Sequence, residues 1–168
     1  CDNKSEVLTW FRDRVTVIDD PEVILNIAGW CPLLAMQYAE ASILQTRDAL
    51  LKQLISVLRQ QVDPVSIATD LQQQSQELTM LLIMTFIKDL LFLSLGGDQR
   101  STCHLDRADV LAKLVHYMDT RKIMVFWKKL MSLQQRIRGA AVPNKALVFD
   151  MLLLQWYELF HLENRTKA

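Results

Sequence analysis

The side chains that most often carry out catalysis or bind metals are few and scattered in this sequence. The histidines are His104, His116 and His161, and the cysteines are Cys1, Cys31 and Cys103. No two of them have the short spacing of a zinc site, and no serine lies in a G-x-S-x-G turn. The pattern gives no support to an enzyme or a metal site. We expect the cysteines to be free thiols in a reducing cytoplasm.

The glycines also argue against a nucleotide cofactor. There are four, at Gly29, Gly96, Gly97 and Gly139. A phosphate-binding loop needs closely spaced glycines that expose backbone N–H groups, and neither of the common glycine motifs can be drawn here. Gly96-Gly97 is instead expected to end a helix, where a left-handed backbone is needed. We therefore expect no bound cofactor.

The clearest charged pattern lies near the end of the chain. At 100° per residue, five basic side chains fall on one stripe of an expected helix, and we refer to them as the basic stripe: Arg121, Lys122, Lys128, Lys129 and Arg136. Apolar side chains fall opposite: Ile123, Phe126, Trp127, Leu130, Leu133 and Ile137. The stripe is the solvated face of an amphipathic helix or, alternatively, a contact for phosphates or an acidic partner surface.

The elements that must position these residues are predicted to be helices. Half of the 168 residues are apolar (51%), but only four are glycine and four proline, too few for the many tight turns of a β-sandwich. Pro21, Pro32 and Pro64 are each expected at the first position of a helix. The predicted helices span 4–14, 21–28, 32–40, 46–60, 64–73, 76–95, 107–118, 120–138 and 145–162, the last of them central. Residues 15–18 are the only β-like run.

Charge and element length place a boundary near residue 42. The net charge is −4 over residues 1–42, −2 over 43–120 and +6 over 121–168, which together give the neutral total. The most apolar stretch, 78–95, is interrupted by Lys88-Asp89. Its charge-free part is therefore too short to cross a bilayer, which takes about 20 residues. We expect a buried core helix there and no membrane span.

Two segments resemble the delta prime subunit family of the bacterial DNA polymerase III clamp loader. Residues 8–11 (Leu-Thr-Trp-Phe) through 27–35 resemble the last helices of that family's AAA+ lid. Residues 139–147, with the Asn144-Lys145-Ala146-Leu147 start and the acidic residue and leucines of 150–154, resemble its final collar helix. The helices between match in length and order. The chain also begins without a methionine, so we expect it to be the C-terminal part of a longer protein.

The resemblance implies an all-α chain in two parts. Residues 1–42 would be the C-terminal helices of the AAA+ lid, and residues 43–168 the collar domain through which clamp-loader subunits oligomerise. The implied partners are the gamma/tau and delta subunits. The implied function is non-catalytic: assembly of the complex that loads the sliding clamp in DNA replication. Contact with DNA would be indirect, in the cytoplasm, with no membrane and no small-molecule substrate.

One turn bears on nucleotide sensing in that family. Where the family has Gly-Ser-Pro-Gly, this chain has Trp30, Cys31, Pro32 and Leu33. In ATP-binding relatives the turn is followed by an arginine that senses the nucleotide, and residues 31–35 contain none. The resemblance therefore implies a degenerate sensor turn in a subunit that does not hydrolyse ATP.

Two other classes of protein compete with this interpretation. A helical ligand-binding or regulatory domain would enclose a void lined by Met80, Met84, Phe86 or Phe149. A nucleic-acid-binding module would use the basic stripe and lose affinity steeply with salt. A filled core with apolar side chains exposed on a helix face would favour the clamp loader.

Overall fold

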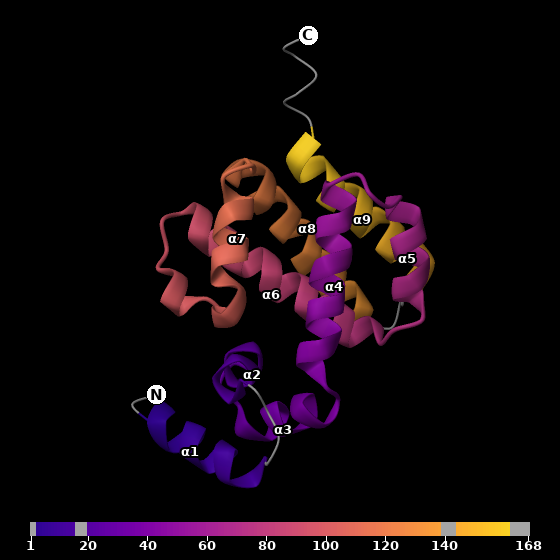
Figure 1. Cartoon of the computed structure of the whole chain (residues 1–168). Coiled ribbons are helices and arrows are strands. Elements are labelled where there is room, and N and C mark those ends of the chain that lie inside the picture. Colours follow the sequence, from indigo (N-terminus) through magenta and orange to yellow (C-terminus); the bar gives the residue numbers. More distant parts are fainter. Residues whose placement is uncertain (1–2, 16–19, 139–143, 162–168) are drawn as a thin grey trace.

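Helices make up all the regular structure of the residues described here. The structure is a computed structural model that describes residues 3–15, 20–138 and 144–161. The first three helices form a small group (Figure 1): α1 (Lys4–Arg14), α2 (Pro21–Ile27) and α3 (Pro32–Glu40). The others form a larger bundle: α4 (Ile43–Leu58), α5 (Pro64–Gln72), α6 (Gln76–Ser94), α7 (Ala108–Val115), α8 (Thr120–Arg138) and α9 (Lys145–His161). The all-α prediction is confirmed.

Helix α4 joins the two groups. In Figure 1 it begins beside α3 and runs up into the bundle, where it packs against α9. In the small group Phe11, Leu25 and Ala35 are fully buried, and they belong to one hydrophobic core together with residues of the bundle. In the bundle, α5 packs along α9, while α7 and α8 pack on α6. Two short 3-10 helices, η1 (Gln99–Ser101) and η2 (Leu105–Arg107), connect α6 to α7.

The helices begin where the prolines predict. Pro21, Pro32 and Pro64 are the first residues of α2, α3 and α5. The residues before them, Asp20, Cys31 and Asp63, make no side-chain capping hydrogen bond. Proline, which has no N–H to satisfy, therefore fixes these starts. The fourth helix begins earlier than predicted, at Ile43, because Ser42 takes a left-handed conformation (φ 51°) that ends α3 and directs the chain into α4.

The end of α6 confirms the role expected of the glycine pair. Gly96 has φ +85°, which glycine adopts without steric cost. The Gly96 N–H donates to the carbonyl of Leu93 and the Gly97 N–H to that of Phe92, both at 3.0 Å. These bonds satisfy carbonyls that would otherwise be unpaired at the helix end. Residues 16–18 of the β-like run lie outside the described residues.

Helix α9 packs against α4, α5 and α8, which confirms a central position in the bundle. Its buried side chains include Val148, Phe149, Leu152, Leu153, Trp156 and Leu159. The indole N–H of Trp156 donates to the carbonyl of Leu54 at 3.0 Å, tying α9 to α4. One face is not covered, because Leu147, Met151 and Leu154 are exposed. Across the described part of the chain, no helix combines the length and apolarity that a membrane span requires.

Two neighbouring leucines of α9 test this packing. Leu152 is 2% exposed and Leu154 is 49% exposed. Leu152→Ala should lower the free energy of unfolding by about 2–5 kcal/mol, because it leaves a cavity in a filled core. Leu154→Ala should change it by less than about 0.5 kcal/mol. Urea denaturation of both variants measures the difference; equal losses would show that α9 does not pack as described.

Candidate functional site

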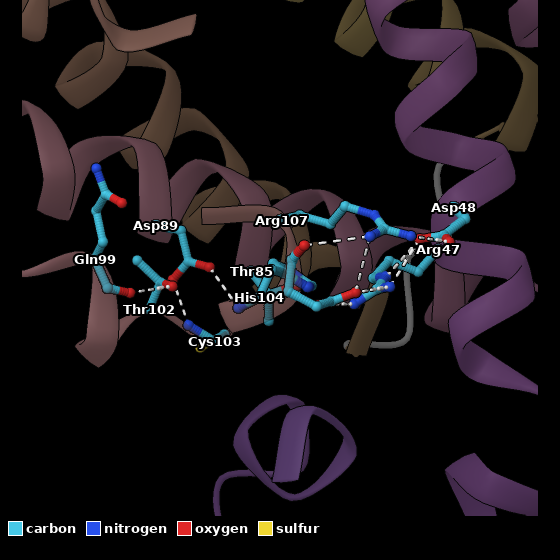
Figure 2. Close-up of polar contacts among 10 residues, drawn as sticks. Arg47, Asp48, Thr85, Asp89, Gln99, Thr102, Cys103, His104 and Arg107 are labelled. Carbon is cyan, nitrogen blue, oxygen red and sulfur yellow. Dashed lines mark hydrogen bonds and ion pairs between the residues drawn. The ribbon is translucent and has the colours of Figure 1, made fainter. Parts of the chain in front are cut away.

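The most strongly connected polar group in the structure joins α4 to η2 (Figure 2). The two guanidinium Nη atoms of Arg47 donate to the two carboxylate oxygens of Asp106, each at 2.7 Å. Arg47 Nε donates to Asp48 at 2.9 Å, and Arg107 donates to the other oxygen of Asp48 at 2.6 Å. Arg47 is 1% exposed. We call Arg47, Asp48, Asp106 and Arg107 the α4–η2 ion-pair network.

The network sets the ionisation of Asp48. Burial acts to raise the pKa of its carboxyl group, but the hydrogen bonds and charges of Arg107 and Arg47 outweigh burial and lower it below the ordinary value of 3.8. The carboxylate therefore stays charged at neutral pH. Asp48 contributes stability above that ordinary pKa and loses it as the pH falls through the lowered value.

A second buried group holds the segment between η1 and η2 against α6. The carboxylate of Asp89 accepts hydrogen bonds from the backbone N–H groups of Cys103 and His104, both at 2.9 Å. His104 Nε2 lies 3.0 Å from the hydroxyl of Thr85, and its ring lies 4.4 Å from that of Phe86. Burial raises the pKa of Asp89. Burial also lowers the pKa of His104 to about 3, with Arg47 adding to the effect.

Both groups stabilise the fold, and neither has the arrangement of a catalytic site. Asp89 and His104 are at most 1% exposed, with no room for a substrate beside them. Among residues 3–15, 20–138 and 144–161, no cluster of histidine, cysteine and carboxylate side chains could hold a metal ion. The sequence pattern missed these networks. Its one signal was a charged pair, Lys88-Asp89, within an otherwise apolar helix.

The turn expected to be a degenerate sensor lies between α2 and α3. Gly29 and Trp30 are both left-handed, at φ 63° and 62°. Trp30 therefore has a glycine-like conformation at the position where the family resemblance places a glycine. Its indole N–H donates to Asn26 at 2.8 Å, and Lys4 Nζ lies 4.7 Å from the centre of its ring. Cys31 and Leu33 are exposed, and Pro32 begins α3.

The side chain of Trp30 contacts other residues of this chain. It is half-buried and packs against the hydrophobic core. It also lines a surface pocket of about 350 Å³ together with Lys4 and Asn26 on one side and η1 residues Arg100 and Ser101 on the other. Trp30 thus makes its contacts within the chain, where the small group meets the α6–α7 connection.

The basic stripe lies on α8 as predicted. Arg121, Lys128, Lys129 and Arg136 are exposed, and Lys122 is half-buried. The expected apolar side is buried at Ile123, Phe126, Leu130 and Leu133 and half-buried at Trp127, while the side chain of Ile137 lies outside the described residues. Met124, Val125 and Met131 are also exposed on this helix, outside its buried side.

The structure divides the basic stripe into two parts. Arg121, Lys122 and Lys129 line a pocket of about 250 Å³ between α8 and α9, whereas Lys128 and Arg136 do not line it. The rest of the lining is formed by Val125, Phe126, Gln155, Glu158 and Leu159. We call this the α8–α9 pocket.

A third surface feature is apolar. Leu147, Met151 and Leu154 are 64%, 39% and 49% exposed. Spacings of four and three residues place them on one side of α9, and we call them the α9 apolar face. By contrast, Met80, Met84, Phe86 and Phe149, which would line a ligand cavity, are all buried in the core and line none of the described pockets.

A comparison with known protein families identifies the chain. Residues 41–158 match the family described as DNA polymerase III, delta subunit, C terminal, which is well over half of the sequence. The chain belongs to this family. Among curated proteins, no sequence matches it. The match makes the chain a clamp-loader-related subunit of DNA polymerase III, in a family of non-catalytic accessory subunits.

The match also corrects one expectation from the sequence. The resemblance predicted the delta prime subunit, but the family that matches is that of the delta subunit. The prediction of a clamp-loader subunit is confirmed, and the choice of delta prime is wrong. The match covers the segment 139–154 but not 8–35, so only the resemblance of the collar part is tested by it. The matched range includes the α4–η2 ion-pair network, the α9 apolar face and every lining residue of the α8–α9 pocket except Leu159.

The α4–η2 ion-pair network predicts unequal effects of its members. Asp106→Asn leaves the buried Arg47 charge without its two-bond partner. It should therefore cost stability near the lower end of the about 3–5 kcal/mol typical of a broken buried pair. Arg107 is 37% exposed in its side chain, and Arg107→Gln should cost less than about 1 kcal/mol. Chemical denaturation measures both; a larger loss in Arg107→Gln would contradict the assignment of Arg47 as the buried centre.

The buried imidazole predicts a pH dependence of stability. His104 is neutral in the folded chain down to about pH 3, whereas its ordinary pKa is 6.5. Unfolding therefore takes up a proton below pH 6.5. This lowers the free energy of unfolding by at most about 1.4 kcal/mol per pH unit. Asp89, whose pKa is raised, acts in the opposite direction at lower pH.

His104→Gln should remove this contribution and flatten the slope of stability against pH between 6.5 and 5. The slope, measured by denaturation at several pH values, separates titration from any constant loss caused by repacking. An unchanged slope in the variant would show that His104 is not the group that takes up the proton.

Proposed function

We propose that this delta-family chain is the collar part of a clamp-loader subunit, and that it assembles with neighbouring collars through the α9 apolar face. The observation that carries the proposal is that face: three large apolar side chains are exposed on one side of a helix whose opposite side is buried in the core. Exposed apolar patches on a folded domain mark protein interfaces. The chain would act as a scaffold and perform no chemistry of its own.

The partner we propose is the collar of the gamma/tau subunit. A stable interface buries about 1,200 Å² or more in total, so the α9 apolar face would form the centre of a larger contact. Together with the family match, the filled core around Phe86 and Phe149 favours this role over a ligand-binding or regulatory domain. In this role the chain would work in the cytoplasm and approach DNA only through the complex.

We further propose that the chain is divided as the sequence suggested, with residues 1–42 as the end of an AAA+ lid and 43–168 as the collar. Three observations support this division. The family match begins at residue 41, Ser42 has a left-handed backbone, and α1–α3 form their own group (Figure 1). In this division, the turn at Trp30 would be a sensor turn that has lost its arginine.

Co-purification tests the function. The chain is expressed with gamma/tau, and the delta subunit or the delta prime subunit is added in separate experiments. A subunit whose place the chain takes should compete with it for gamma/tau, and a subunit that it assembles with should co-elute with it. The unaltered chain should elute with gamma/tau as one complex. If it elutes alone under all combinations, the clamp-loader function is wrong.

Charge substitutions test the surface. The double variant Leu147→Glu/Leu154→Glu should lose at least about tenfold in affinity for gamma/tau, because it places charge in an apolar interface, while its melting temperature changes little. Leu33→Glu is the matched control: Leu33 is 69% exposed but lies on α3. If the double variant binds as well as the control, assembly uses another surface.

A further inference from the structure

The α8–α9 pocket combines two properties that the apolar face of α9 lacks. Its floor is apolar, with Phe126 and Leu159 at 3% and 5% exposed, and Val125 forms an accessible apolar wall. Its rim on the α8 side carries the cations Arg121, Lys122 and Lys129. A volume of about 250 Å³ suits one large apolar side chain and is small for a cofactor.

The charges of the rim are unequal on the two sides. The α8 side has three cations, and the α9 side has one carboxylate, Glu158, which is exposed. An anionic ligand would therefore be attracted towards α8 and repelled from α9. Gln155, also on the α9 wall, has an amide oxygen that is buried without a hydrogen-bond partner within the described residues. A small turn of this side chain would offer an amide to the backbone of a bound segment.

We propose that the α8–α9 pocket binds a short acidic segment of a partner protein, with one aromatic or large aliphatic side chain inserted between the helices and its carboxylates over α8. Charge complementarity supports an acidic partner, and the apolar floor supports a peptide over a polyanion. None of the three side chains of the α9 apolar face lines the pocket, although Glu158 lies one turn beyond Leu154 on the same side of α9. The proposal does not depend on the function proposed above.

The division of the basic stripe argues against DNA as the occupant. A nucleic-acid surface would engage phosphates along the whole stripe, including Lys128 and Arg136, with affinity set by the number of cations. A peptide in the pocket would depend on Arg121 and Lys129 and be nearly indifferent to Lys128 and Arg136. The two pairs are well matched, because each contains one arginine and one lysine, all four are exposed, and all lie on α8.

Fluorescence anisotropy of the full chain with a labelled peptide tests the proposal. The probe is a synthetic heptapeptide with one central phenylalanine flanked by glutamates and aspartates, and its partner has alanine in place of phenylalanine. We expect the phenylalanine peptide to bind in the range of tens of micromolar, about −6 kcal/mol, and the alanine peptide to bind at least about tenfold more weakly.

Charge-reversal variants distinguish an acidic peptide from a nucleic acid as the ligand of the α8–α9 pocket. Arg121→Glu/Lys129→Glu should weaken binding by at least about tenfold, and Lys128→Glu/Arg136→Glu by less than about threefold. Glu158→Gln should strengthen binding a few-fold by removing the repulsion on the α9 side. A far-ultraviolet circular dichroism spectrum confirms that each variant is folded, and co-elution with gamma/tau serves as an independent readout of the α9 apolar face.

Three results would overturn the proposal. The first is no binding of the phenylalanine peptide up to millimolar concentration. The second is equal affinity for the phenylalanine and alanine peptides, which would show that the pocket takes no side chain. The third is an equal loss in both charge-reversal pairs together with tighter binding of a single-stranded oligonucleotide, which would make the basic stripe a nucleic-acid surface.

Discussion

The buried guanidinium of Arg47 constrains the rest of the structure more than any other single group. A charge in a protein interior is tolerated only where it is paired and hydrogen-bonded. Arg47 donates two hydrogen bonds to Asp106, which lies on η2, 59 residues further along the chain. Arg47 lies on α4, the helix that joins the small group to the bundle (Figure 1). The pairing therefore fixes the α6–α7 connection relative to α4, and Asp89 fixes the same connection to α6 (Figure 2).

This arrangement suits a scaffold. The buried polar groups are used to hold helices to one another, and the surfaces left for partners lie elsewhere, on α8 and α9. One is apolar and lies on one side of α9, and the other combines cations with an apolar floor. Membership of the delta-subunit family places these surfaces on a subunit of DNA polymerase III. A rigid chain with separate surfaces can contact more than one partner at once.

Much of the fold could be predicted from the sequence, because its signals are local. Proline at the first helical position and the helical spacing of apolar residues located the helices to within a few residues. The basic stripe was placed correctly for the same reason. The pairing of Arg47 with Asp106 could not be predicted, since no local pattern links residues so far apart. The α9 apolar face was also hidden, because α9 is apolar on nearly every side and packing alone decides which side stays open. The distinction between delta and delta prime came from the family match over residues 41–158 and not from the short motifs.

The central claim is that the α9 apolar face becomes buried when the subunit assembles. Hydroxyl-radical footprinting of Met151, which is 39% exposed, tests it directly in the chain alone and in its complex with gamma/tau. Met36, in the small group, serves as the internal reference. The account predicts that oxidation of Met151 falls at least about fivefold in the complex, because burial removes access of the radical to the thioether, while that of Met36 is unchanged. Equal oxidation of Met151 in the free and assembled chain would contradict it.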